Sequence, residues 1–155
     1  MRVVVSFPRK EYCLLRKYLF KGYKEQAGFL FVTSAVADST INIFVQGIYL
    51  ITAKGWDYQS SFHLDLNDGE KLKVILEARK RGSDLIECHS HRCRGPAGFS
   101  KSDLYGFDEF VQYVWWKLPG KIYGAIVFTE DESLGQIWLP KQKKEILINQ
   151  IKIID

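Results

Sequence analysis

Apolar and polar residues follow two different periods along this chain, which predicts a mixture of strands and helices. Short apolar or alternating runs bounded by Gly, Asp, Ser and Lys are typical of β-strands. We predict strands over 3–7, 26–32, 41–53, 60–66, 84–91, 121–128 and 134–139, and a last apolar segment over 145–154. The stretches at 38–40 and 54–57 are interpreted as turns between strands.

Three other stretches place apolar residues three and four positions apart, which is the spacing of one helical face. We predict helices over 11–22, 71–82 and 107–120. The residues expected to face the core are Leu14, Leu15, Tyr18, Leu19, Leu72, Val74, Ile75, Ala78, Phe107, Phe110, Val111, Val114 and Trp115. A Gly, or a Pro followed by Gly, closes each helix. With no repeat or linker in view, we expect a single α/β domain over 1–155.

Length and composition indicate that the fold does not depend on a bound metal. The chain has 155 residues, of which 46% are hydrophobic and 26% charged, as in ordinary globular domains. A domain of this length buries a continuous core without disulfide or metal staples. A metal site in this chain would therefore not be needed for structure alone.

Charge and cysteine usage narrow the expected partners and location. The net charge is +4, and the longest basic cluster, at 141–144, is short enough to be a solvated turn, so we expect no nucleic-acid partner. Three cysteines without a C-x-x-C pair are typical of reduced cytosolic thiols. The N-terminal stretch does not look like a signal peptide, and apolar runs such as 27–32 and 123–128 are far below membrane-spanning length. We expect a soluble cytoplasmic protein with no membrane partner.

The histidines carry the clearest chemical signal. The chain has only three, and His89 and His91 lie one residue apart at the end of the predicted strand over 84–91. Residues two apart on a strand project to the same side, so both imidazoles can bind one metal ion. His63 has no such partner and is interpreted as structural.

A helix start follows the two histidines. Ser100 and Asp103 have the S-x-x-D spacing of a capping box, and capping alone would account for them. A helix that begins beside the strand end also brings the Asp103 carboxylate close to both imidazoles. Two His and one Asp, with a fourth position left for water, form the ligand set of a catalytic zinc site.

Two further residues bear on this hypothesis. Glu25 lies between a predicted helix and a predicted strand, where it can act as a base that is not itself a ligand. Cys93 is a rival ligand to Asp103, because it would share the face of His89 and His91 if their strand continued. The composition of 92–96 favours a break in the strand before Cys93.

The combination of E-x-x-G-x-L at 25–30, H-S-H at 89–91 and S-x-x-D at 100–103 resembles the JAMM motif of the JAB/MPN metalloproteases. The order and separations match, and the corresponding elements run from Val3 to Leu139. The resemblance implies a mixed central sheet flanked by helices, as in cytidine deaminases. It also implies that His89, His91 and Asp103 bind one catalytic Zn²⁺, that Glu25 shuttles a proton, and that Ser100 stabilises an oxyanion.

The loop after the histidines departs from the family pattern. Eight residues separate His91 from Ser100 where the family usually has seven, and Arg92 stands where a Pro is common. Gly95, Pro96 and Gly98 can absorb the extra residue as a bulge. We therefore keep Ser100 and Asp103 as the matching positions.

The resemblance implies hydrolysis of the amide bond after the C-terminus of a ubiquitin-like protein, by a deconjugase or a precursor processor. The compact domain looks like the prokaryotic stand-alone members, some of which belong to ubiquitin-like conjugation systems with antiphage roles. Its partners would be a ubiquitin-like protein or its conjugates, together with activating and conjugating enzymes. The alternatives are a peptidase that processes sulfur-carrier proteins and a catalytically silent MPN binding scaffold. A nucleotide deaminase is disfavoured, because the chain lacks H-x-E and P-C-x-x-C.

Overall fold

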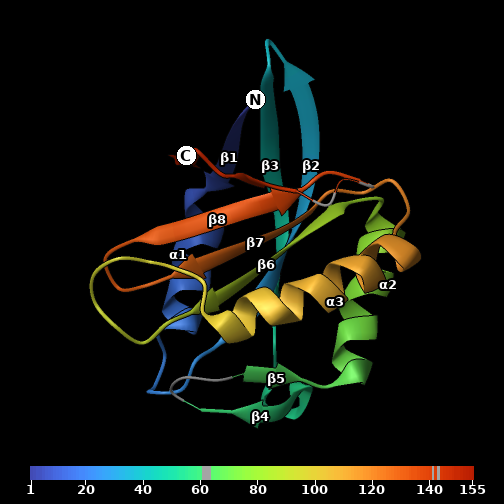
Figure 1. Ribbon diagram of the computed structural model, residues 1–155. Helices are drawn as coiled ribbons and strands as arrows, with labels where there is room; N and C mark the ends of the chain where they lie inside the picture. The colour runs from blue at the N-terminus through green and yellow to red at the C-terminus, as the bar shows by residue number, and fades with distance from the viewer. Residues whose placement is uncertain (61–63, 141, 143) are drawn as a thin grey trace.

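A single mixed sheet of eight strands runs through the molecule, in the order β10-β1-β3-β2-β6-β7-β8-β9 (Figure 1). The structure, a computed structural model, describes residues 1–60, 64–140, 142 and 144–155. The strands of this sheet are β1 (Arg2–Pro8), β2 (Ala27–Ala37), β3 (Thr40–Leu50), β6 (Asp84–Ser90), β7 (Tyr123–Phe128), β8 (Ser133–Trp138), β9 (Glu145–Leu147) and β10 (Gln150–Ile154). Strand β1 is parallel to β10 and β3, and β6 is parallel to β7. The other neighbouring pairs are antiparallel.

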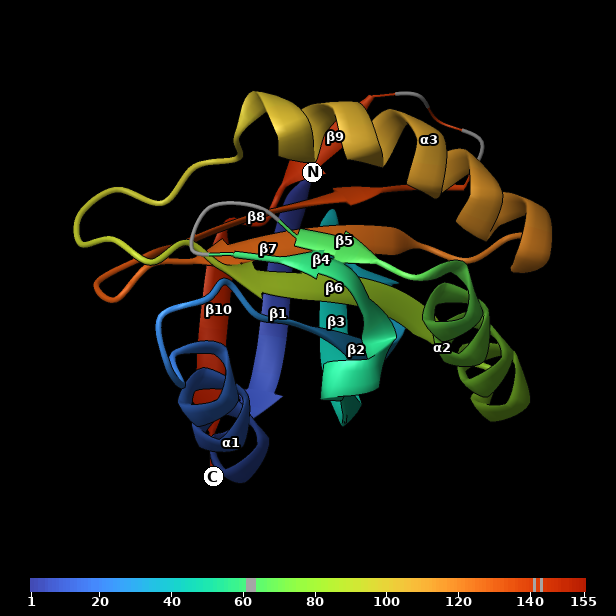
Figure 2. The same ribbon diagram turned by 90° about the horizontal axis from the view of Figure 1, so that it is seen from below.

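Helices cover both faces of the sheet. Helix α1 (Arg9–Leu19) lies on one face, and α2 (Asp68–Arg81) and α3 (Lys101–Lys117) lie on the other (Figure 2). Each face has its own apolar cluster, one including Leu15 and Leu19 of α1, the other including Val74 of α2 and Val111 and Val114 of α3. The predicted α/β architecture, a mixed central sheet flanked by helices, is therefore confirmed.

A second, two-stranded sheet lies on the face covered by α2 and α3 (Figure 2). It consists of β4 (Trp56–Gln59) and β5 (Leu64–Leu66), and a short 3-10 helix, η1 (Ala53–Gly55), precedes it. Trp56 and Leu66 pack against the apolar cluster on that face. The structural role predicted for His63 lies outside the described residues, as does part of the turn predicted at 141–144.

The three predicted helices form, but two residues predicted to face the core are exposed, and two helix ends differ from the prediction. Leu14 and Leu72 were expected to face the core, and both are exposed, by 49% and 37%. A sheet covers only one side of a helix, and on these two helices that buried side holds Leu15, Leu19, Val74 and Ile75 instead. Helix α1 ends at Leu19 rather than Gly22, and α3 begins at Lys101, well before the predicted residue 107.

Two predicted strands also end earlier than expected. Strand β3 stops at Leu50 and β6 stops at Ser90, so neither reaches the end of its apolar run. After β6 the chain turns, since the Cys93 amide donates to the His91 carbonyl at 2.8 Å. None of the helices in the described ranges is long and apolar enough to span a membrane.

Strand β2 is held closely between its neighbours at Gly28. This residue pairs with Leu50 of β3 and Cys88 of β6. A Cβ atom at Gly28 would lie 3.0 Å from the Tyr49 carbonyl oxygen and 3.4 Å from the Leu15 side chain. Glycine is needed here because both the backbone of β3 and the Leu15 side chain of α1 crowd the position that a Cβ would take.

We predict that Gly28→Ala lowers the free energy of unfolding by about 1–3 kcal/mol, because backbone atoms cannot move aside as a flexible side chain can. Urea denaturation followed by circular dichroism measures this difference. Gly106→Ala is the matched control, since a Cβ there meets nothing within 4 Å and Ala is favoured in the middle of α3. Equal effects of the two substitutions would contradict the close approach at Gly28.

Candidate metal centre

His89 and His91 project from the end of β6. Strand β6 lies between β2 and β7, where His89 pairs with Ala27 and Val127. His91 follows the strand, and its amide donates to the Phe128 carbonyl at 2.8 Å. The two Nε2 atoms are 3.3 Å apart, so the rings converge on the same side, as predicted from their spacing.

Asp103 reaches the same point from the first turn of α3. Ser100 is the N-cap residue, and its Oγ accepts from the Asp103 amide at 3.1 Å. In return, Asp103 Oδ2 accepts from the Ser100 amide at 2.8 Å, which completes the capping box. The same Oδ2 atom lies 3.2 Å from Nε2 of both His89 and His91. The capping interpretation and the ligand interpretation therefore describe one arrangement.

The spacing of these three atoms fits a metal ion. A tetrahedral ion with bonds of about 2.0–2.1 Å has neighbouring ligand atoms about 3.3–3.4 Å apart. The observed separations, 3.2 and 3.3 Å, match that edge length. Among the described residues, His89, His91 and Asp103 form the group of ligand side chains that could hold a metal.

The charges at this site are strongly coupled. Burial alone would raise the pKa of Asp103, but the hydrogen bonds from His89 and His91 outweigh it, and the pKa of this carboxyl lies well below its usual range. Burial lowers the pKa of His89, yet the hydrogen bond and charge of Asp103 outweigh burial and raise it overall. Asp103 is thus an anion at neutral pH, as metal binding requires.

Glu25 lines the same cavity as two members of the metal-binding group, His89 and Asp103. The cavity has a volume of about 200 Å³, and Glu25, His89, Ser100 and Asp103 line it. Glu25 is buried just before β2, where its amide donates to the Ser60 carbonyl at 2.6 Å and its carbonyl accepts from the Gln59 side chain at 2.7 Å. The structure therefore brings together all five predicted site residues, Glu25, His89, His91, Ser100 and Asp103.

Cys93 is not part of the metal-binding group. Strand β6 ends at Ser90, so Cys93 does not continue the face of the two histidines, and its side chain is exposed. Cys88 is buried in the core on the opposite face. The alternative in which a thiolate replaces Asp103 as the third ligand has no support in this geometry.

The sequence reasoning missed a buried carboxylate that lines the cavity in addition to Glu25 and Asp103. Glu87 lies two residues before His89 and lines the same cavity. Its Oε2 accepts from the Tyr123 hydroxyl at 2.6 Å, and burial raises its pKa. The alternation along β6 that grouped His89 with His91 could also have found Glu87.

Comparisons with known proteins do not assign a family. No family model matches the chain, and no curated protein matches it. Among solved structures, the chain is similar to the Trichoplax adhaerens STIL N-terminal domain, with 11% sequence identity and a TM-score of 0.44 over 86% of this chain. This chain spans 41% of the length of that one. A likeness this weak carries no inference about activity.

We predict that the wild-type protein, purified without added metal, contains one divalent metal ion per chain. Asp103→Asn should lose most of this metal, because an amide lacks the anionic oxygen that binds the ion. The substitution keeps the helix cap, because the amide oxygen can still accept from the Ser100 amide. Elemental analysis measures the metal content. Cys93→Ala is the control and should keep the ion; metal retained in Asp103→Asn but lost in Cys93→Ala would contradict the assignment.

Proposed function

We propose that this protein is a zinc-dependent peptidase or isopeptidase of the JAB/MPN type. It hydrolyses the amide bond that follows the C-terminus of a ubiquitin-like protein. The main support is the arrangement in which Glu25, His89, Ser100 and Asp103 line one cavity while His91 completes the metal-binding group with His89 and Asp103. The proposal includes the finer fold assignment, a JAB/MPN domain related to cytidine deaminases.

Zinc suits this ligand set better than calcium or magnesium, which prefer oxygen ligands. Two imidazoles and one carboxylate leave a fourth position open, which distinguishes catalytic zinc sites from structural ones. Zinc bound there would supply a Lewis acid that polarises the substrate carbonyl and lowers the pKa of an attacking water to about 7.

Glu25 is the proposed general base. Its carboxylate comes from the segment before β2, whereas the ligands come from β6, the residue after it and α3. Glu25 therefore reaches the cavity without belonging to the ligand group. In this role Glu25 accepts a proton from the attacking water and donates it to the departing amine. Backbone bonds to Gln59 and Ser60 hold the residue in place for both transfers.

Ser100 is the proposed oxyanion donor. Its bond to the Asp103 amide uses a lone pair of Oγ and not the hydroxyl proton. Ser100 is exposed at the rim of the cavity, where that proton can be donated to the oxygen of a tetrahedral intermediate. The capping bond therefore orients a donor next to the metal-binding group.

The small sheet offers a place for the substrate tail. Trp56 of β4 and Leu66 of β5 line the cavity, and a two-stranded sheet has an outer edge on each strand. An extended peptide can add to such an edge through backbone hydrogen bonds. We place the tail of the ubiquitin-like protein there, in a cytoplasmic, bacterial conjugation system that also contains activating and conjugating enzymes.

We predict that Glu25→Ala keeps its zinc and loses turnover, because the base is removed and the ligands are not. The assay measures cleavage of fusions that join the tails of different ubiquitin-like proteins to a reporter, with and without a zinc chelator. Chelator should abolish wild-type cleavage. Unchanged turnover in Glu25→Ala would discard the mechanism, and a zinc-loaded wild type that cleaves no fusion would favour the binding scaffold.

Ser100→Ala should lower the rate by about a hundredfold or more through loss of the oxyanion donor. It should also cost about 1 kcal/mol of stability through loss of the cap. Asn67→Ala is the matched control, because Asn67 caps α2 by accepting from the Glu70 amide at 2.8 Å and lies outside the cavity lining. The cleavage rate and the free energy of unfolding are measured for both variants. A wild-type cleavage rate in Ser100→Ala as well as in Asn67→Ala would contradict the role of Ser100.

A further inference from the structure

The loop over 92–99 connects two ligands of the candidate metal centre. It begins directly after His91 and ends directly before Ser100, the N-cap residue of the helix that carries Asp103. The loop contains no helix or strand, and Gly95 adopts a φ of +99°. A loop with two glycines loses much conformational entropy when it is ordered. Something outside the loop must therefore hold His91 and Asp103 at their observed spacing.

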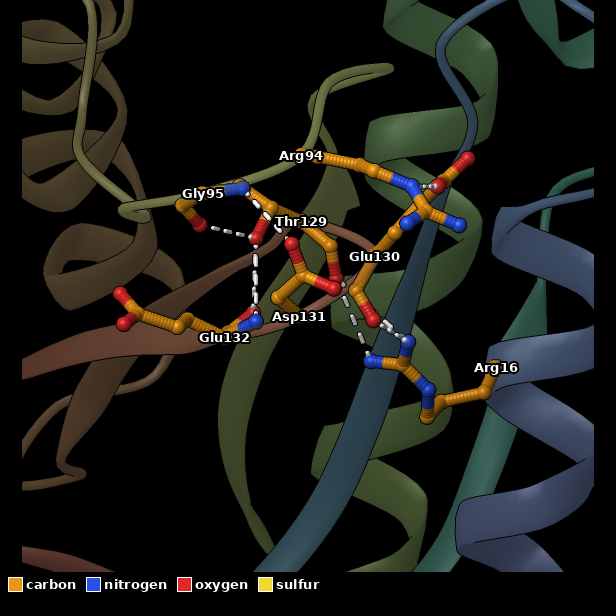
Figure 3. Close-up of polar contacts among 7 residues, drawn as sticks. All are labelled: Arg16, Arg94, Gly95, Thr129, Glu130, Asp131 and Glu132. Atoms are coloured by element: carbon orange, nitrogen blue, oxygen red, sulfur yellow. Dashed lines mark hydrogen bonds and ion pairs between the residues drawn. The ribbon is translucent and has the colours of Figure 1, made fainter.

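The turn between β7 and β8, residues 129–132, contacts this loop repeatedly (Figure 3). Asp131 Oδ2 accepts from the Gly95 amide at 2.9 Å, and Glu132 Oε2 accepts from the Ala97 amide at 3.3 Å. The Glu130 amide donates to the Cys93 carbonyl at 3.2 Å. Three alternate residues of the loop, Cys93, Gly95 and Ala97, are thus bonded to the turn, one through the backbone and two through carboxylate side chains.

Thr129 connects the loop to the inside of the turn. It is fully buried, its hydroxyl donates to the Gly95 carbonyl at 2.8 Å, and its Oγ1 accepts from the Glu132 amide at 3.0 Å. One side chain therefore holds the loop backbone and the turn backbone together. The Arg94–Glu130 ion pair, at 3.1 Å, is more exposed and adds little.

The turn is itself anchored to the opposite face of the sheet. Arg16 of α1 reaches it and donates to the carbonyls of Thr129, at 3.4 Å, and Glu130, at 3.0 Å (Figure 3). The Arg16 guanidinium also lies 4.8 Å from the centre of the Phe20 ring. The turn is thus a fixed support rather than a second flexible loop.

We propose that the β7–β8 turn is a clamp that positions the metal centre, with Thr129, Asp131 and Glu132 as its positioning residues. By holding the loop over 92–99, the clamp keeps His91 and Asp103 at the distance that one ion requires. The inference rests on the proposed zinc site. It adds a function to three residues that lie outside both the ligand set and the cavity lining.

The test is the rate at which zinc leaves the loaded protein when a chromogenic zinc chelator is added. The double variant Asp131→Ala, Glu132→Ala should release zinc on the order of tenfold faster than wild type, the scale of losses seen for residues that support metal ligands. Thr129→Val should do the same. Thr129→Ser keeps the hydroxyl and should restore the wild-type rate.

Glu130→Ala is the matched control, because it removes only the exposed ion pair and keeps the backbone bond to Cys93. Its release rate should stay within about twofold of wild type. Asp131 and Glu132 are exposed, so the melting temperature of the metal-free double variant should match that of metal-free wild type. A lowered melting temperature with an unchanged release rate would show an ordinary structural role and overturn the clamp.

The outcomes also separate the clamp from the proposed function. Wild type that holds zinc, together with variants that release it at the wild-type rate, would overturn the clamp and leave the peptidase intact. Wild type that holds no zinc would overturn the zinc site. The amide hydrogen exchange of Gly95 and Ala97 would then decide the clamp: faster exchange in the double variant supports it, and unchanged exchange overturns it.

Discussion

One carboxylate oxygen organises the candidate metal centre. Asp103 Oδ2 faces the Ser100 amide and the Nε2 atoms of His89 and His91, all within 3.2 Å. The end of strand β6 and the start of helix α3 must meet for this contact to exist. The fold keeps these two ends together by packing α3 on the sheet and by pairing β6 with β2 and β7.

Local geometry explains why much of the site was predictable. His89 and His91 share a face because of strand alternation, and Ser100 and Asp103 form a capping box because of helix spacing. Both patterns span only a few residues, so they can be read without tertiary structure. Glu25 differs, because its place beside the ligands depends on the pairing of β2 with β6. It was proposed from its place just before a predicted strand, and the family resemblance then supported that choice.

The parts that were missed depend on contacts between distant segments. The β7–β8 turn meets the loop over 92–99 across more than thirty positions of sequence, as in the Gly95–Asp131 bond with a separation of 36. The position of β1 between β10 and β3 is likewise set by sheet order and not by a local pattern. Leu14 and Leu72 were placed in the core because a helical period shows which residues share a face and not how wide a strip the sheet covers.

The residues of the site are separated by very different numbers of positions in the sequence. These separations affect the order in which the site assembles during folding. His89 and Asp103 are 14 residues apart, whereas the bond that ties the Glu25 segment to β6, from the Gln26 amide to Ser90, joins residues 64 apart. Closing a short loop costs less entropy than closing a long one. In folding terms, the segments that carry His89 and Asp103 can approach each other early, and the β7–β8 turn then holds the loop between them. The segment that carries Glu25 joins them only after the long-range pairing of β2 with β6.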